Sequence, residues 1–286
     1  MNIHRIYCQV YACCCFVTVC LGALLVANTG HAQDERVQYF PRKVDYPKAI
    51  PNKENVWIFV MAGQSNMAGR GMVEPRDTVS NDRILTINAA NEIILAKEPL
   101  HFYEPNLTGL DCGISFANTL LQDIGKDVSI LLIPAAVGGS SSKQWLGDSL
   151  HRNVKLMSNF RQRIASIEKF GTIQGILWHQ GESDTDDVNL PGYEERLKRI
   201  FARLREYCNG SPDLPILIGE LGSFSENQDR WNAINTAIHK YAKSDRNAFV
   251  VATGDLKAKS DKIHFDSDSQ REMGKRMAEA FLKMTK

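Results

Sequence analysis

The 286-residue sequence carries no excess of charge of either sign. Its formal net charge is +1, and Asp, Glu, Lys and Arg make up 23% of the residues. A chain that binds nucleic acid holds the phosphates with a dense basic surface and releases their counterions, and no such surface is expected here. Nucleic acid is therefore excluded as an expected partner.

Cysteine is scarce beyond the first 20 residues. Positions 8, 13, 14, 15 and 20 hold cysteine, and only Cys112 and Cys208 follow. Two cysteines far apart in the sequence cannot build a metal site by themselves. They either form a disulfide in an oxidising compartment or remain buried free thiols, and we favour the free thiols.

Two common active-site motifs are also missing. Residues 63–70 follow an apolar run but lack the Gly-Lys-Ser/Thr ending of a phosphate-binding loop. A nucleophile elbow needs glycine two positions before and two positions after its serine. Gly63 is present before Ser65, but Met67 occupies the second position. A nucleotide-binding site and an ordinary α/β-hydrolase are both disfavoured.

The N-terminus has the pattern of an export signal. Arg5 precedes an uncharged apolar stretch from about Val10 to Val26, and small and polar residues follow it up to Ala32. This pattern predicts a signal peptide over residues 1–32 and a periplasmic or extracellular protein. A retained membrane anchor is one alternative, since about 17 apolar residues are near the lower limit for a span. Lipid attachment at Cys20 is another.

The remaining chain is long enough for one α/β domain. Residues 33–55 are polar, contain three prolines and predict an extended lead-in, so the folded domain covers residues 56–286. Short, almost wholly apolar runs predict five buried strands at Val56–Met61, Val128–Pro134, Ile173–Trp178, Pro215–Gly219 and Ala248–Ala252. Amphipathic segments predict five helices at Ser115–Ile124, Asn153–Phe170, Tyr193–Tyr207, Glu226–Lys243 and Asp268–Lys283.

Strands and helices alternate along this domain. Such alternation predicts a three-layer α/β/α sandwich around a mostly parallel, five-stranded sheet. Arg83–Asn88 and Glu92–Ala96 predict an additional hairpin inserted after the first strand.

Several chemically capable residues follow predicted strands, whose carboxyl ends meet at one edge of a parallel sheet. Ser65 comes after the first strand, and His264 comes after the fifth, three positions beyond Asp261. A serine nucleophile needs a histidine base, and the histidine is usually oriented by a carboxylate. Taken singly, Ser65 fits a helix N-cap better than a nucleophile, and Asp-x-x-His occurs by chance in many loops.

The segment 178–184 is the densest polar cluster and follows the third predicted strand. An acyl-transfer site needs donors aimed at the oxyanion of the tetrahedral intermediate. The Gln180 side chain, Gly113 and the backbone N–H of Ser65 are the candidate donors. The alternative is a polar loop that caps the next helix. His179 and Glu182 have the spacing of metal ligands, but two ligands make a weak metal site.

Three segments together resemble one family: Gly63-Gln64-Ser65-Asn66-Met67, Trp178-His179-Gln180-Gly181-Glu182-Ser183-Asp184 and Asp261-Lys262-Ile263-His264. From about residue 56 to the C-terminus, the chain resembles the sialate O-acetylesterase and acetylxylan esterase group, carbohydrate esterase family 6, of the SGNH hydrolases. The resemblance implies a sheet of the SGNH-hydrolase, flavodoxin-like type. It also implies Ser65 as nucleophile, His264 as base and Asp261 as orienting acid, with Glu182 as the alternative acid.

The resemblance also implies roles for the surrounding residues. Gln180 and Gly113 would complete the oxyanion hole with Ser65. The expected substrate-binding residues are Gln64, Asn66, Gly139, Ser140, Trp145, His179 and Glu182.

The function that follows is a serine esterase that removes O-acetyl groups from a carbohydrate through an acetyl-serine intermediate. This chemistry requires no metal or organic cofactor. A membrane would be a partner only through an uncleaved leader or a lipid anchor. One alternative is a non-catalytic carbohydrate-binding protein with Trp145 and Trp178 as stacking platforms; another is a transacylase that uses the same triad. The identity of the sugar, acetylxylan, sialic acid or another glycan, stays open.

Overall fold

The computed structural model of the chain describes residues 35–284. The predicted signal peptide and Cys20 lie outside the described residues, so export, anchoring and lipid attachment stay predictions. Within residues 35–284, no helix is both long and apolar enough to cross a membrane.

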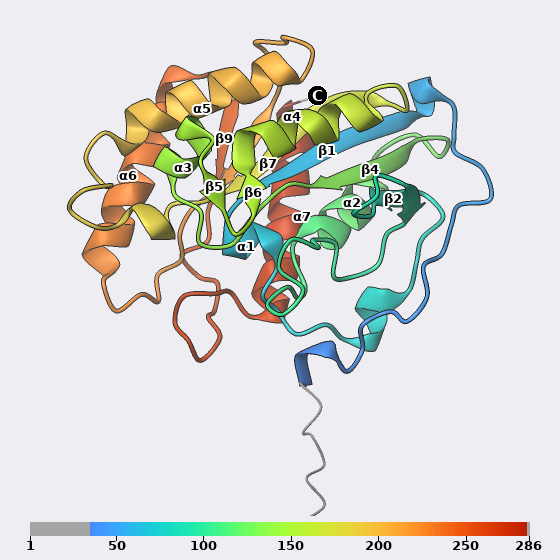
Figure 1. Cartoon of the computed structure of the whole chain (residues 1–286), viewed down its shortest axis with the longest axis horizontal. Helices are drawn as coiled ribbons and strands as arrows, with labels where there is room; N and C mark the ends of the chain where they lie inside the picture. Colours follow the sequence, from blue (N-terminus) through green and yellow to red (C-terminus); the bar gives the residue numbers. More distant parts are fainter. Residues whose placement is uncertain (1–34, 285–286) are drawn as a thin grey trace, which may run out of the picture. The chain divides into compact units, whose positions relative to one another are not determined.

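A seven-stranded sheet forms the centre of the described chain (Figure 1), with the strand order β3-β2-β4-β1-β7-β8-β9. Its strands are β1 (Val56–Gly63), β2 (Ile84–Ile87), β3 (Ile93–Leu95), β4 (Ser129–Pro134), β7 (Thr172–His179), β8 (Ile216–Gly219) and β9 (Ala248–Val251). All neighbours are parallel except β2 and β3. The mostly parallel α/β fold is therefore confirmed.

The predicted number of five strands is wrong, although all five predicted strands are present. The predicted hairpin forms as β2 and β3, and β2 also pairs with β4 in parallel register, with Ile84 opposite Ile130. The hairpin therefore extends the main sheet. Periodicity alone showed the hairpin but not the strand with which its edge would pair.

Helices cover both faces of the sheet. One layer consists of α3 (Ser142–Gly147), α4 (Leu156–Ile167), α5 (Tyr193–Tyr207) and α6 (Gln228–Ser244), which contact one another. The opposite layer pairs α2 (Gly113–Leu120) with α7 (Ser267–Met284). Each layer packs on its own apolar core. The predicted α/β/α sandwich is present.

Some helix ends differ from the prediction. Helix α4 begins at Leu156 because Val154–Lys155 forms β6, which pairs with β5 (Leu150–His151). Helix α2 is displaced toward the N-terminus relative to the predicted segment. The short helix α1 (Ser65–Ala68) follows β1 directly and was not among the predicted helices.

Strand β1 lies at the centre of the sheet, between β4 and β7, where the order of strands changes direction. Ligands of doubly wound folds bind at such a switch point. Gly63 ends β1 with φ +133°, and a Cβ there would lie 2.1 Å from the carbonyl oxygen of His179. Glycine lets the ends of β1 and β7 approach, and Gln64 N–H donates to that carbonyl at 2.9 Å. Ser65 is thereby placed above the switch point.

The lead-in is irregular apart from two short 3₁₀ turns, Glu35–Val37 and Lys53–Asn55, and it packs against the sheet domain. The backbone carbonyl of Asp45 accepts from Leu95 N–H at 2.8 Å, and its side chain pairs with Lys97. Arg36 Nη1 donates to the Thr108 carbonyl at 2.6 Å. The lead-in therefore packs on the domain and also adds side chains to its surface.

Cys112 and Cys208 are both buried and free, as favoured from the sequence. Burial raises the pKa of the Cys112 thiol well above its ordinary value and that of Cys208 to about 12. Neither thiol therefore has the thiolate character of a reactive cysteine.

Candidate active site

Ser65, Asp261 and His264 form a continuous chain of hydrogen bonds. His264 Nε2 lies 3.0 Å from Ser65 Oγ, and His264 Nδ1 lies 2.9 Å from Asp261 Oδ2. A carboxylate only accepts, so Nδ1 carries the proton, and in the neutral ring Nε2 presents its lone pair to the serine. Gln64, not Ser65, is the N-cap of α1. The helix-cap interpretation of Ser65 is therefore wrong.

Asp261 is held in place by more than the imidazole. Its Oδ1 accepts from the backbone N–H groups of Ile263 and His264, each at 2.9 Å. Partial burial acts to raise the pKa of Asp261, but these bonds and the imidazole outweigh it, so the pKa lies below its ordinary value. The carboxylate is therefore charged at neutral pH.

Glu182, the alternative orienting acid, faces other groups. Its Oε1 accepts from Asn66 Nδ2 at 2.5 Å and lies 3.6 Å from His179 Nδ1. Nδ1 of His264 is already bonded to Asp261, so the geometry favours Asp261. Within residues 35–284, His179 and Glu182 are not part of any group of three His, Cys, Asp or Glu side chains arranged to hold a metal.

A cavity of about 500 Å³ opens above the Ser65 hydroxyl. Six of the residues that line it were predicted site residues, namely Gln64, Ser65, Gly139, Glu182, Asp261 and His264. The structure thus brings together residues that are separated by up to 199 positions in the sequence.

Four residues expected to bind substrate are fully buried instead: Asn66, Ser140, Trp145 and His179. Trp145 Nε1 donates to Ser140 Oγ at 3.0 Å, and Ser140 Oγ donates to the Gly63 carbonyl at 3.2 Å. His179 Nε2 bonds the Glu220 carbonyl at 2.9 Å. These side chains support the loops of the site from beneath and do not line the cavity.

Trp178 is also buried, and its ring packs edge-on against Trp145 with centroids 5.2 Å apart. A sugar-stacking platform must expose a ring face to solvent. The alternative of a binding protein that uses these two tryptophans as platforms is therefore contradicted.

Two expected oxyanion donors do not face the cavity. The backbone N–H of Gly113 donates to Asp111 Oδ1 at 2.7 Å, and the glycine packs beneath Met61 and Leu100 in the core. Gln180 is fully buried, and its Nε2 has three acceptors: Gln64 Oε1, the Ser140 carbonyl and Asp184 Oδ2. The expected oxyanion roles of Gly113 and Gln180 are therefore corrected. Spacing in the sequence can place a residue at the end of a strand, but it does not determine where the donor group of that residue points.

Three residues that line the cavity have donors without an acceptor in the described chain. Gln64 Oε1 accepts from Gln180 Nε2 and from the backbone N–H groups of Gly181 and Ser183, at 3.2 to 3.4 Å. This orientation leaves Gln64 Nε2 without a protein acceptor among residues 35–284, and Gln64 lines the cavity. The backbone N–H groups of Ser65 and Gly139 likewise have no acceptor within that part of the chain.

The cavity wall carries cations that no motif indicated: Arg36, Arg70, Arg152 and Lys259. Buried Glu104 pairs with Arg70 at 2.8 Å and with Arg152. It also accepts from Gly138 N–H at 2.5 Å. Burial acts to raise the pKa of Glu104, but these partners outweigh it and hold the pKa below its ordinary value. Glu104 thereby ties three separate loops to one carboxylate.

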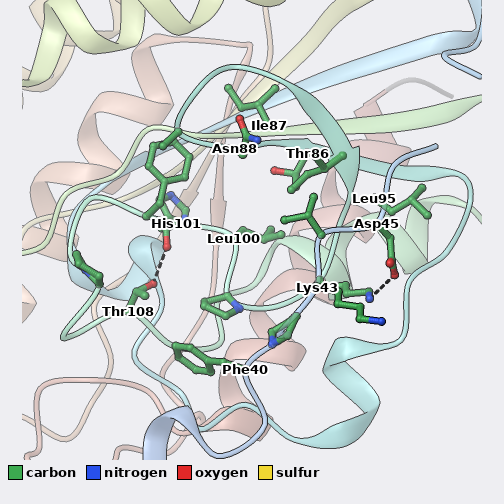
Figure 2. A pocket seen from close by; sticks show the side chains of 18 residues that line it. Phe40, Lys43, Asp45, Thr86, Ile87, Asn88, Leu95, Leu100, His101 and Thr108 are labelled. Carbon is green, nitrogen blue, oxygen red and sulfur yellow. Dashed lines mark hydrogen bonds and ion pairs between the residues drawn. The ribbon is translucent and has the colours of Figure 1, made fainter.

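A second cavity, of about 350 Å³, lies at the β2–β3 edge of the sheet (Figure 2). Phe40 and Lys43 of the lead-in lie on one side of it and Ile87 of β2 on the other. It is lined mainly by apolar side chains and does not include Ser65 or His264. This edge cavity shares the lead-in and the loop 104–108 with the cavity above Ser65.

Comparisons with known proteins agree with this geometry. The family model of carbohydrate esterases described as sialic acid-specific acetylesterases matches residues 55–283. The chain belongs to this family. It is a carbohydrate esterase, and the SGNH-type fold expected from its motifs is confirmed.

Individual relatives support the same assignment. The chain is 29% identical over 244 residues to a probable carbohydrate esterase of Arabidopsis thaliana, covering 79% of this chain and 90% of the relative. The crystal structure of that plant protein matches with a TM-score of 0.70 over 79% of this chain and 98% of the plant chain. NanS, at 18% identity, matches with a TM-score of 0.65 over 82% of this chain and 99% of its own. A carbohydrate acetylesterase from Xanthomonas citri, also 18% identical, matches with a TM-score of 0.58 over 78% of this chain and 55% of its own. The last two show the fold alone.

Proposed function

We propose that this carbohydrate esterase removes O-acetyl groups from acidic sugars through an acetyl-serine intermediate. The observation that carries the proposal is the hydrogen-bonded chain from Asp261 through His264 to Ser65 at the floor of a cavity. Nucleophile, base and orienting acid are then all in contact before substrate binds.

In the first step, Ser65 Oγ attacks the acetyl carbonyl carbon while His264 Nε2 takes the hydroxyl proton. The tetrahedral intermediate collapses, the C–O bond to the sugar breaks, and His264 returns the proton to the sugar oxygen. In the second step, water attacks the acetyl-serine with His264 again as base, and acetate and free Ser65 are released. Asp261 stays ionised throughout and stabilises the imidazolium.

The oxyanion would be held by three donors that have no other acceptor in the described chain. These are the backbone N–H groups of Ser65 and Gly139 and the side-chain amide of Gln64. Donors of this kind contribute about a hundredfold to a thousandfold each to the rate. Gln64 thus takes the role that the sequence assigned to Gln180, and Gly139 takes that of Gly113.

The charge of the cavity supports an acidic sugar. Its wall has four cationic side chains and two carboxylates, and a third carboxylate, Glu104, pairs with Arg70 and Arg152 of the wall. Four cations against three carboxylates leave an excess of one positive charge. A carboxylate on the substrate would therefore meet a net positive field. An O-acetylated sialic acid has such a group, whereas neutral acetylxylan does not.

An acetate-release assay tests the proposal. Purified residues 33–286 are supplied with O-acetylated sialic acid, acetylated xylo-oligosaccharides and neutral sugar acetates. We expect the highest kcat/KM on the acidic sugar and a loss of at least about 10⁴-fold in Ser65→Ala. Retained hydrolysis by a correctly folded Ser65→Ala protein would refute the mechanism. Equal kcat/KM on acidic and neutral sugars would refute the acidic substrate only.

Transacylation is the remaining alternative, because an acetyl-serine reacts with any alcohol that reaches it. Product analysis with an added acceptor sugar separates the two activities. We expect free acetate as the main product, and acetylated acceptor as the main product would favour the transacylase.

A further inference from the structure

Asn66 follows the nucleophile in the chain, yet its side chain faces away from the cavity. It is fully buried and is not among the cavity-lining residues. Its Oδ1 accepts from Phe265 N–H at 3.0 Å, and its Nδ2 donates to the Ile263 carbonyl at 3.1 Å. One amide thus bonds the backbone on both sides of His264.

Other bonds complete the hold on this loop. The backbone N–H of His264 is bonded to Asp261, and its carbonyl accepts from Lys259 N–H at 2.8 Å. The Asn66 carbonyl accepts from the buried Gln270 side chain at 2.9 Å, at the start of α7. The residue beside Ser65 is therefore fixed to the chain on both sides of the base.

The orientation of the Asn66 amide is set by Glu182. Glu182 Oε1 accepts from Nδ2 at 2.5 Å. If the amide were turned over, its oxygen would face the Glu182 carboxylate and the Ile263 carbonyl, and its nitrogen would face the Phe265 N–H. All three bonds would be lost, because like groups would then meet.

We propose that Asn66 is a positioning residue that holds His264 Nε2 at hydrogen-bond distance from Ser65 by bonding the backbone of Ile263 and Phe265, with Glu182 fixing the orientation of its amide. This inference rests on the proposed function. It gives the two acids separate tasks, since Asp261 orients the imidazole and Glu182 orients the amide that holds the loop.

The Asn66→Asp variant tests the first part with almost no change in shape. Its carboxylate still accepts from Phe265 N–H but repels the Ile263 carbonyl and Glu182. A displacement of about 1 Å between reacting groups costs about a hundredfold in rate. We therefore expect kcat on p-nitrophenyl acetate to fall about a hundredfold while KM changes less than about twofold. Asn118→Asp, at an exposed asparagine of α2, is the matched control and should keep wild-type kinetics.

The role of Glu182 is tested by conservative rescue. Glu182→Gln keeps an acceptor for Asn66 Nδ2, so we expect less than about a tenfold loss of kcat. In the double variant Asn66→Asp/Glu182→Gln, the new amide donates to the new carboxylate, and we expect about tenfold recovery over Asn66→Asp alone. A loss in Glu182→Gln as large as that of Asp261→Asn would place Glu182 beside the histidine and overturn this part.

Two further readouts keep the test decisive. Thermal unfolding of each variant, with kinetics measured well below the midpoint, separates unfolding from misplacement. An Asn66→Asp variant with a lowered unfolding midpoint but wild-type kcat would show a merely structural role. A raised KM at unchanged kcat would show substrate contact. Either result overturns the proposal.

The rate of fluorophosphonate labelling of Ser65 depends only on the serine and its base. If the wild type is labelled but releases no acetate from sugars, the proposed substrate fails while the Asn66 effect on labelling still tests the positioning.

Discussion

The cavity above Ser65 and the edge cavity at β2–β3 are neighbours with different chemistry. The first lies at the carboxyl end of the central strand and contains two serines, a histidine, two carboxylates and four cations. The second lies at the side of the sheet and is lined mainly by apolar side chains. Both use the lead-in and the loop 104–108 as walls.

The polar groups explain the difference. In the edge cavity, three of the polar side chains are bonded to protein partners: Asn88 to Glu92, Thr86 to the Leu132 carbonyl, and Lys97 to Asp45. The buried His101 Nε2 has no partner in the described chain, but neither Ser65 nor His264 lies in this cavity. In the cavity above Ser65, three donors have no acceptor in the described chain, and the nucleophile faces its base. A cavity can serve as a reaction site when unpaired hydrogen-bond donors and acceptors line it. An apolar volume alone is insufficient.

Leu95 and Leu107 give the sharpest matched test of this contrast. Leu95 is buried and lines the edge cavity, whereas Leu107 is exposed and lines the cavity above Ser65. We expect Leu95→Ala to lower the free energy of unfolding by about 2 to 3 kcal/mol, because it removes buried methyl groups. Leu107→Ala should change it by no more than about 0.5 kcal/mol. Urea denaturation measures both.

Kinetics complete this test. The folded Leu95→Ala protein should keep wild-type kcat and KM for acetate release. A loss of kcat in folded Leu95→Ala, at substrate saturation, would mean that the edge cavity takes part in the reaction, and the contrast would not hold.

A smaller effect is expected from one cation of the wall. Arg152 is half-exposed and paired with Glu104. We expect Arg152→Gln to raise KM for an acidic acetyl sugar about tenfold, or about 1.4 kcal/mol, with kcat nearly unchanged. KM for a neutral sugar acetate is the internal control and should stay within about twofold. An equal rise in KM for both substrates would mean that Arg152 supports the cavity wall but does not recognise the negative charge of the substrate.

The sequence was informative where function depends on local spacing. Asp261 and His264 lie in one short loop, and Ser65 follows a strand whose apolar run is unmistakable, so strand-end reasoning placed the three together. The alternation of apolar and amphipathic segments likewise predicted the three layers. These features depend on residues that are close in sequence or on the general geometry of parallel sheets.

The errors have a common physical origin. Gln64 and Gln180 are both glutamines at strand ends, and only the three donors around Gln64 Oε1 determine which amide faces the cavity. Trp145 was expected to contact the sugar, but its ring packs against that of Trp178. Arg70 and Arg152 are joined through Glu104, 34 and 48 positions away. Orientation and long-range pairing depend on tertiary packing, which spacing does not encode.

Covalent labelling tests whether Ser65 is the nucleophile. The purified protein is treated with a fluorophosphonate, digested and analysed by mass spectrometry to locate the adduct. We expect one adduct at Ser65, formed with loss of esterase activity. We expect no adduct when the wild type or the Asp261→Asn variant is denatured before the treatment. An adduct at another serine, or full inactivation without modification of Ser65, would contradict it.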